Sequence, residues 1–165
     1  MSMINIGGTV STSILTGIQK GDVQPNAVDL RLGKVFNIDD NTFTIDEDKK
    51  THRGSTEQEL WEDGYYYLYP GSYEVIMENT IYVGPDEAGF VITRSTLNRN
   101  GCFLTSGLYD TGYDGVMAGV LHVGVGLMRI KPGTRVGQYL NWKAEAVSSY
   151  DGDYGKGKSH DQKYG

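Results

Sequence analysis

The sequence of 165 residues contains a single cysteine, Cys102. A lone cysteine excludes an internal disulfide and a cysteine-based metal cluster, so we expect Cys102 to be a small buried residue. No apolar run approaches the ~18 residues of a membrane-spanning helix. Residues 1–17 also lack the basic region and the apolar core of a secretion signal. These absences predict a soluble, cytoplasmic protein.

Cationic charge is scarce: 15 Lys and Arg residues stand against 21 Asp and Glu, and the net charge is −6. Non-specific binding of polymeric nucleic acid needs a cationic face, so this class of protein is excluded, although a few Arg side chains in one pocket can still bind a small anion. Phe and Trp are few, whereas 23 Gly and 12 Tyr are present. Gly at turns and Tyr on half-buried strands predict an all-β domain of the sandwich or jelly-roll-like barrel type.

The residue pattern predicts strands over most of the chain. We expect single strands at 27–33, 73–77, 81–83, 90–93 and 135–142, a strand pair within 34–45, and two strands joined near 124–126 within 116–130. In the first of these, Asp29 lies opposite the apolar face. If it takes no part in a binding site, it is interpreted as a solvent-facing residue. Residues 11–19 predict a short N-terminal helix.

In two segments, apolar residues do not recur at the spacing of a helix or a strand. Residues 46–63 are the most polar stretch and predict a mobile surface loop or insertion. We expect one β-rich domain over residues 1–148, followed by a C-terminal arm over 149–165 that is rich in Gly and charge. The arm has two interpretations, a disordered tail or a segment that closes over a ligand.

A cationic turn and a carboxylate form the strongest candidate site. A predicted strand is followed by Arg94, Ser95, Thr96 and Arg99. Their two guanidinium groups and two hydroxyls can bind phosphate oxygens. Asp110 follows sixteen residues after Arg94 and can activate a water for attack on phosphorus if a hairpin over 101–109 folds back into the same pocket. Each feature also has a plain interpretation. The cationic turn can be an ordinary solvated turn, and Asp110 can be part of a simple Asp-Thr-Gly turn.

Five segments in order resemble the motifs of the trimeric dUTPase and dCTP deaminase superfamily. They are AVDLRLG at 27–33, RSTLNR at 94–99, GLYDTGYDG at 107–115, GTRVGQ at 133–138, and the tail with Tyr150, Lys158 and Gln162. The resemblance spans roughly residues 25–165. It implies a distorted jelly-roll or β-barrel-like fold, a homotrimer with sites at subunit interfaces, a pyrimidine deoxynucleotide substrate, and Mg²⁺ as cofactor.

The resemblance also implies roles for the matched residues. Asp110 would be the catalytic residue that orients the attacking water, and Tyr113 would pack against the deoxyribose. Asp29 would steady Mg²⁺ through water. The remaining substrate contacts would come from a base-reading backbone at Thr105, Ser106, Gly107 and Tyr109, from phosphate ligands Arg94, Ser95, Thr96, Arg99 and Gln138, and from Tyr150, Lys158 and Gln162 in the arm.

One position separates the two branches of the superfamily. Deaminases carry a catalytic Glu ten residues after the third-motif Asp, and this chain has Val120 there. Valine cannot transfer protons, and His122, a conceivable substitute on the same strand face, is better interpreted as a packed residue. We therefore expect a dUTP diphosphatase that forms dUMP and pyrophosphate. The alternatives are a dCTP deaminase, with one or both activities, and a catalytically idle nucleotide-binding regulatory protein.

Overall fold

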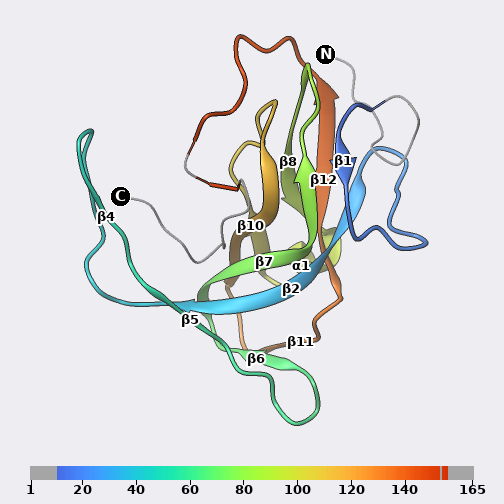
Figure 1. The fold of residues 1–165 in the computed structure, drawn as a ribbon. Coiled ribbons are helices and arrows are strands. Elements are labelled where there is room, and N and C mark those ends of the chain that lie inside the picture. Colours follow the sequence, from blue (N-terminus) through green and yellow to red (C-terminus); the bar gives the residue numbers. More distant parts are fainter. Residues whose placement is uncertain (1–10, 153, 156–165) are drawn as a thin grey trace.

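The computed structural model describes residues 11–152, 154 and 155, which form an antiparallel β-structure with one short helix (Figure 1). The all-β prediction is confirmed. The elements are β1 Ile14–Leu15, β2 Val28–Ile38, β3 Thr44–Ile45, β4 Lys50–Thr51, β5 Ser55–Glu57, β6 Tyr66–Leu68, β7 Gly71–Tyr82, β8 Glu87–Thr93, α1 Ser95–Arg99, β9 Cys102–Thr105, β10 Asp114–Val123, β11 Met128–Ile130 and β12 Arg135–Lys143. None of the described helices is long and apolar enough to cross a membrane.

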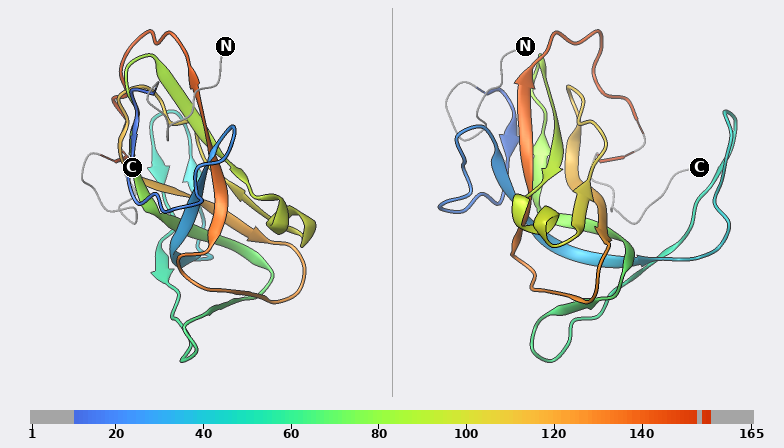
Figure 2. Two further views of the ribbon diagram at one scale, coloured as in Figure 1. Left: turned by 90° about the vertical axis from the view of Figure 1, so that its right-hand side faces the viewer. Right: turned by 180° about the vertical axis from the view of Figure 1, so that it is seen from behind.

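The main sheet curls into a nearly closed barrel (Figure 2). Its strand order is β8-β12-β2-β7-β10-β9, with antiparallel neighbours throughout. The two ends of this order meet where Thr93 Oγ1 donates to Leu104 O at 2.9 Å and accepts from Leu104 N at 2.8 Å. Closure of this kind leaves few unpaired edge groups, which protects the sheet from pairing with other chains.

The barrel interior is filled by side chains that alternate along each strand. Val28, Leu30 and Leu32 of β2 are all buried, as their alternation predicts, and they join one core cluster with residues such as Leu104 and Tyr139. Each such side chain contributes roughly 1.5–3 kcal/mol when it is removed from water. Cys102 is also buried, as expected of a lone cysteine.

The helix predicted over residues 11–19 does not form. This segment contains the short strand β1 instead. The backbone there is held by tertiary bonds. Thr12 N and Ser13 N both donate to the carboxylate of Glu87, while Thr16 N donates to Thr80 O at 3.0 Å. These pairings draw a segment rich in β-branched residues into extended structure. The one described α-helix is α1, which begins directly after Arg94.

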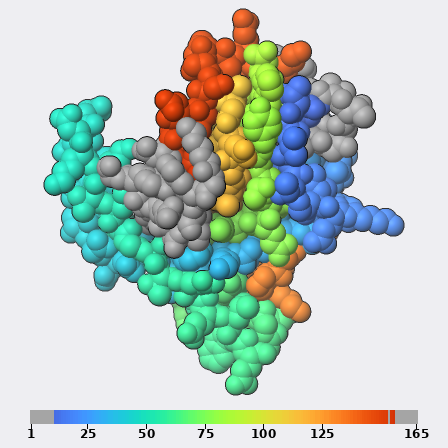
Figure 3. Space-filling model, viewed as in Figure 1, coloured from blue at the N-terminus to red at the C-terminus, as the bar shows by residue number. Residues whose placement is uncertain are grey.

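The polar region after β2 differs from its prediction. Strand β2 continues to Ile38 and pairs with β5, while β3 pairs with β4, so the expected strand pair within 34–45 does not form. The stretch 46–63, predicted as a loop, therefore contains two strands. Figures 1 and 3 show that β3 and β4 form a hairpin that projects from the body of the molecule.

Two further strand predictions were right about strand content but not about partners or limits. Residues 116–130 do form two strands, but β10 pairs with β7 and β9, whereas β11 pairs with β6. The separate strands expected at 73–77 and 81–83 are one strand, β7. Asn79 does not interrupt it because its buried side chain accepts from Arg31 N at 3.0 Å and donates to Thr16 O at 2.8 Å.

Candidate functional site

The predicted site residues fall into two clusters at opposite ends of β8. Arg94 directly follows β8, next to the pair Thr93–Gly137, whereas Tyr109 bridges to Gly89 near the start of the strand and Asp110 follows it. At about 3.3 Å per residue the two clusters are roughly 17–20 Å apart. The hairpin over 101–109, on which a shared pocket depends, therefore does not bring Arg94 and Asp110 of one chain together. Strand β9 pairs with β10 and carries the chain away from Arg94 before Asp110 is reached.

The first cluster is organised by Asp29, whose side chain is 0% exposed. Its carboxylate lies 3.5 Å from Arg94 Nε and 3.3 Å from Arg135 Nη1. Gln138 Nε2 and Gln24 Nε2 each donate to it at 3.1 Å. A buried carboxylate is tolerated only with such partners, so Asp29 is not the solvent-facing residue of the plain interpretation. It fixes two guanidinium groups and an amide whose remaining N–H groups can meet an anion.

A magnesium ion has no protein cage here. Both oxygens of Asp29 are engaged, and the described part of the chain holds no group of three or more His, Cys, Asp or Glu residues that could ligate a metal. Mg²⁺ prefers octahedral oxygen ligands and is often held by one or two carboxylates together with substrate phosphates. The residues therefore fit an ion carried by the phosphates of a ligand, with Asp29 acting at most through water.

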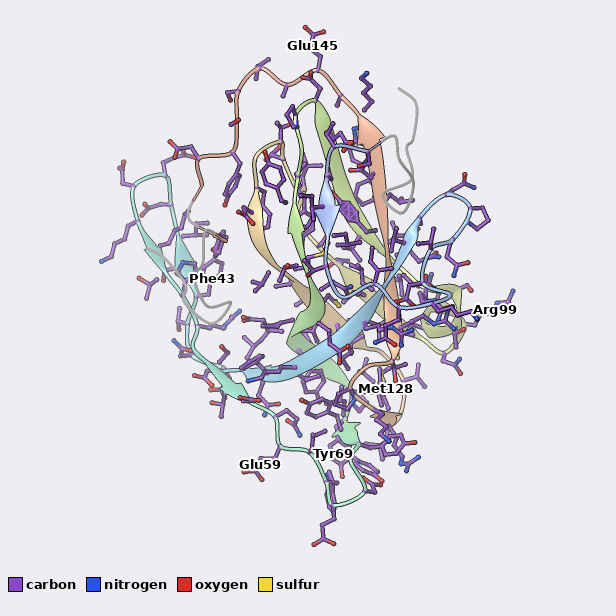
Figure 4. All side chains as sticks on the ribbon, turned by 45° about the vertical axis from the view of Figure 1, so that its right-hand side comes forward. Phe43, Glu59, Tyr69, Arg99, Met128 and Glu145 are labelled. Carbon is purple, nitrogen blue, oxygen red and sulfur yellow. The ribbon has the colours of Figure 1, made fainter. Side chains whose placement is uncertain are left out.

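Helix α1 continues the cationic cluster. Its buried Leu97 anchors it, and Leu97 N donates to Arg94 O at 3.0 Å. Ser95 and Thr96 lie exposed on the first turn, where no side chain caps the helix. Arg99 points outward at the far end of the helix (Figure 4). The structure thus brings Arg94, Ser95, Thr96 and Gln138 to one end of the barrel, with Arg99 at its margin.

The second cluster surrounds Asp110. Its carboxylate is exposed, has no partner among the described residues, and borders a cavity of about 560 Å³ that Trp142, Tyr150 and residues 144–149 also line. The turn is tightly built: Asp110 O accepts from Tyr113 N at 3.0 Å, and Thr111 Oγ1 donates to Glu87 O at 2.6 Å. This rigid turn presents an available base to a pocket of ligand size.

Tyr113 lies behind Asp110 and is 7% exposed. Its ring packs edge-to-face on Tyr109 and on Tyr150, each at 5.2 Å between centroids, and its hydroxyl donates to Val116 O at 2.6 Å. Burial, assisted by Tyr150 and Asp114, raises the pKa of Tyr113 to about 12. Gly155 approaches the same ring so closely that a Cβ there would lie 2.9 Å from it.

The described part of the C-terminal arm therefore covers Tyr113 in this chain. Tyr150, predicted to close over a ligand, instead packs on the ring that was predicted to hold the sugar. Tyr150 and Gly155 thus occupy the space beside the Tyr113 ring. Lys158 and Gln162 lie outside the described residues.

The predicted base-reading backbone is only partly available. Tyr109 N and O are both bonded to Gly89, at 2.7 and 3.0 Å, and its buried ring belongs to the core. Ser106 Oγ accepts from Val91 N and donates to Gly107 O. Thr105 ends β9, and Gly107 faces open space, since a Cβ there would meet no heavy atom within 4 Å. The open stretch of this loop thus lies around Gly107.

Comparisons with known proteins agree with this geometry. A model of the dCTP deaminase-like family matches residues 9–143. The chain belongs to the dCTP deaminase-like family. It is 33% identical over 148 residues to a probable deoxyuridine 5'-triphosphate nucleotidohydrolase of Aeropyrum pernix, covering 88% of this chain and 92% of that protein. It is 30% identical over 155 residues to the protein of the same name from Methanopyrus kandleri, covering 92% and 99%.

Solved structures support the same fold. The 2'-deoxycytidine 5'-triphosphate deaminase of Agrobacterium tumefaciens aligns with a TM-score of 0.60 at 19% identity, over 78% of this chain and 42% of that chain, so this protein spans less than half of the deaminase. A variant of the dUTPase of Staphylococcus bacteriophage 80alpha aligns with a TM-score of 0.51 at 11% identity, over 88% and 98%. Both likenesses concern the fold, and they agree with the family assignment.

Val120 stands where the resemblance implies a Glu in deaminases. Val120 lies on β10 between Thr105 and Glu74 and offers no proton-transferring group. His122 stacks on Phe103 at 4.7 Å between centroids and bonds to Ser72 Oγ at 3.0 Å. These contacts place a half-buried His122 ring on the surface of the sheet.

Arg135 is a site residue that sequence reasoning missed. It lies within GTRVGQ, three residues before Gln138, and simple strand alternation would place these two side chains on opposite faces. The register of β12 against β2 shifts between Arg135 and Gly137, and both Arg135 and Gln138 reach Asp29. Such a bulge changes the direction in which a side chain points. The residue pattern of β12 does not predict the bulge.

Proposed function

We propose that this protein hydrolyses dUTP to dUMP and pyrophosphate. The observation that carries the proposal is the carboxylate of Asp110, which lies on a cavity rim with no partner among residues 11–152, 154 and 155, in a chain with Val120 where a deaminase needs Glu. The names of the Aeropyrum and Methanopyrus relatives point the same way. A regulatory protein without catalysis would not need an available base, and a deaminase would need a proton-transferring residue at position 120.

The reaction assigns a task to each cluster. Asp110 would accept a proton from a water whose oxygen forms a bond to the α-phosphorus, while the bond from that phosphorus to the α–β bridging oxygen breaks and pyrophosphate leaves. Arg94, Arg135 and Gln138, held by Asp29, would stabilise the charge that develops on the phosphate oxygens. Mg²⁺ bound to the phosphates would align them and neutralise part of their charge.

The separation of the clusters favours a site shared by two chains. A triphosphate cannot bridge roughly 17–20 Å between Asp110 and Arg94 of one chain, but the carboxylate end of one subunit can face the cationic end of another. An exposed apolar strip is available for such contact, where Phe90 packs edge-to-face on Trp142 at 5.4 Å and Ile92 lies beside it on β8. We propose a homotrimer, the symmetric assembly that the family resemblance implies.

A turnover panel tests the activity. dUTP, dCTP, dTTP and UTP are each incubated with the full chain and Mg²⁺, and nucleotide, pyrophosphate, phosphate and ammonia are resolved separately. We expect dUMP and pyrophosphate in equal amounts from dUTP. Ammonia from dCTP would assign deamination instead, and binding of a nucleotide with no turnover of any would assign a regulatory role.

A further inference from the structure

An aromatic pocket lies apart from both clusters. Its lining consists of Trp61, Tyr67, Tyr69, Tyr73, Asn37 and Gln58, and it encloses about 490 Å³. We call it the Trp61 pocket. It is built by the loop before β6, by β6 and the start of β7, and by the end of β2, where Asn37 pairs with Tyr73. In Figure 4 Tyr69 and Glu59 lie together at one end of the molecule, away from Arg99 and Glu145.

Two of the four rings in this pocket, those of Tyr67 and Tyr73, are held by hydrogen bonds of their hydroxyls. Tyr73 Oη donates to Tyr69 O at 2.8 Å. Tyr67 Oη donates to Asp63 and accepts from Arg129 Nε, the latter at 3.0 Å. Trp61 meets Tyr67 edge-on, with 5.2 Å between centroids. The walls formed by Tyr67 and Tyr73 are therefore fixed, and Trp61 packs against one of them.

Folding of the chain leaves much of this aromatic surface in water. Trp61 is 63% exposed and Tyr69 is 71% exposed. The segment around residues 60–70 forms a prominence at the lower end of the molecule in Figure 3. Aromatic side chains contribute large areas to cores and interfaces, so two such rings beside a pocket indicate a binding role. The residue types decide which ligand the pocket suits.

The local electrostatics favour a cation. The lining contains no charged side chain, and the faces of its four rings carry the negative end of the aromatic quadrupole. Glu59 and Glu62, on the same loop as Trp61, are exposed and form no ion pair with any other described residue. Beside the pocket, Arg129 Cζ already lies 3.4 Å from the ring centroid of Tyr65 and 5.9 Å from that of Tyr67. Tyr65 lies outside the lining and also has Lys131 Nζ at 5.9 Å from its ring centroid, while Asp63 pairs with Arg129 at 3.3 Å, so the cations beside the pocket are balanced by Asp63 together with Glu59 and Glu62.

We propose that the Trp61 pocket binds a quaternary ammonium group, carried either by a small molecule or by a trimethylated lysine side chain. Such a group has a full positive charge and no N–H to donate, so aromatic faces suit it better than carboxylates or carbonyls do. The side-chain amides of Asn37 and Gln58 can bond to polar atoms next to the ammonium group. The volume is in the range of small-ligand sites.

The two tryptophans provide an internal control for a binding test. Heteronuclear NMR of the full chain follows the indole N–H signals of Trp61 and Trp142 during titration with choline. We expect the Trp61 signal alone to shift and saturate, with a dissociation constant on the order of 1 mM. The neutral isostere of choline, in which a tert-butyl group replaces trimethylammonium, should bind at least about tenfold more weakly, because it keeps the shape and loses the charge.

Variants and a second probe complete the test. By calorimetry, Trp61→Leu and Tyr69→Leu should each weaken choline binding about fivefold or more, whereas Tyr82→Leu, which removes an exposed tyrosine elsewhere on β7, should leave it unchanged. A short peptide with trimethyl-lysine separates the two sources of the group, and binding of either probe supports the site. The proposal is overturned if neither probe shifts Trp61, if the neutral isostere binds equally well, or if the pocket variants bind like the parent.

Discussion

The two ends of β8 place a carboxylate in opposite environments. At one end Asp29 is fully buried, and its carboxylate is surrounded by Arg94, Arg135, Gln138 and Gln24. At the other end Asp110 is exposed on a rigid turn, and its carboxylate has no partner among the described residues. A buried, fully bonded carboxylate acts on neighbouring side chains, whereas an open one can act on a ligand. We therefore expect substitution of Asp110 to affect catalysis alone and substitution of Asp29 to affect the stability of the fold as well.

The largest effect is expected at the open end. Asp110→Asn should lower the turnover of dUTP by about 10²–10⁴-fold, because the amide cannot accept the proton of the attacking water. Its melting temperature should match that of the parent, since the carboxylate bonds to none of the residues that the structure describes. Asp114→Asn, an exposed neighbour on the same segment, is the control and should keep near-parental turnover. Full activity of Asp110→Asn would remove Asp110 from the mechanism.

At the buried end the expected effect is on the fold as well. Asp29→Ala leaves Arg94 and Arg135 without their shared partner, and breaking a buried pair typically costs about 3–5 kcal/mol. Denaturant unfolding at fixed protein concentration measures the loss, and activity should fall with it. Lys34→Ala, which removes a surface pair with Glu57 at 3.4 Å, is the matched control and should cost about 1 kcal/mol or less. Equal losses in both variants would contradict the organising role of Asp29.

A pH dependence should arise from Glu87, a second buried carboxylate. Burial opposes its ionisation, but hydrogen bonds from Ser11, Ser13 and the backbone of Thr12 prevail and hold its pKa below the usual 4.5. A lowered pKa contributes stability above the unfolded pKa, and this contribution is lost as the pH falls through the folded value. Unfolding free energy measured from pH 6 down to about pH 3 should decline less steeply in Glu87→Gln than in the parent. Exposed Glu145→Gln should leave the slope unchanged.

The smallest effect is expected where the arm meets the open end. Tyr150→Leu removes the edge-to-face contact with Tyr113, and such pairs contribute about 0.5–1.5 kcal/mol. Stability should fall by that amount, and protease cleavage after residue 149 should become faster. An unchanged cleavage rate would show that the ring contact does not hold the arm.

The sequence predicts the barrel well because its signals are local. Alternation in β2 places Leu30 and Leu32 in the core, and Gly-punctuated runs mark strands such as β10. The residues predicted to form one site lie in two groups, with Ser95 and Thr96 next to Arg94 at one end of β8 and Tyr113 near Asp110 at the other. Their separation could not be foreseen, because it depends on strand pairing between β9 and β10 rather than on spacing along the chain.

Other features were hidden for equally physical reasons. The bulge in β12 that turns Arg135 toward Asp29 depends on register, which no single-strand pattern encodes. Residues 11–19 lie in extended structure because Glu87 and Thr80 bond to their backbone from distant parts of the chain. The aromatic residues of the Trp61 pocket are visible in the sequence, yet only the pairing of β6 with β11 and of β2 with β7 assembles them.

The most direct test of the account asks whether the two ends of β8 act together across subunits. Asp110→Asn and Arg94→Gln are prepared singly and co-expressed, and dUTP turnover is measured in each preparation. If each site takes Asp110 from one chain and Arg94 from another, both single variants are nearly inactive, and random mixing restores about one quarter of the parental sites. Turnover in the mixture that equals only the residual rates of the two single variants would contradict a shared site.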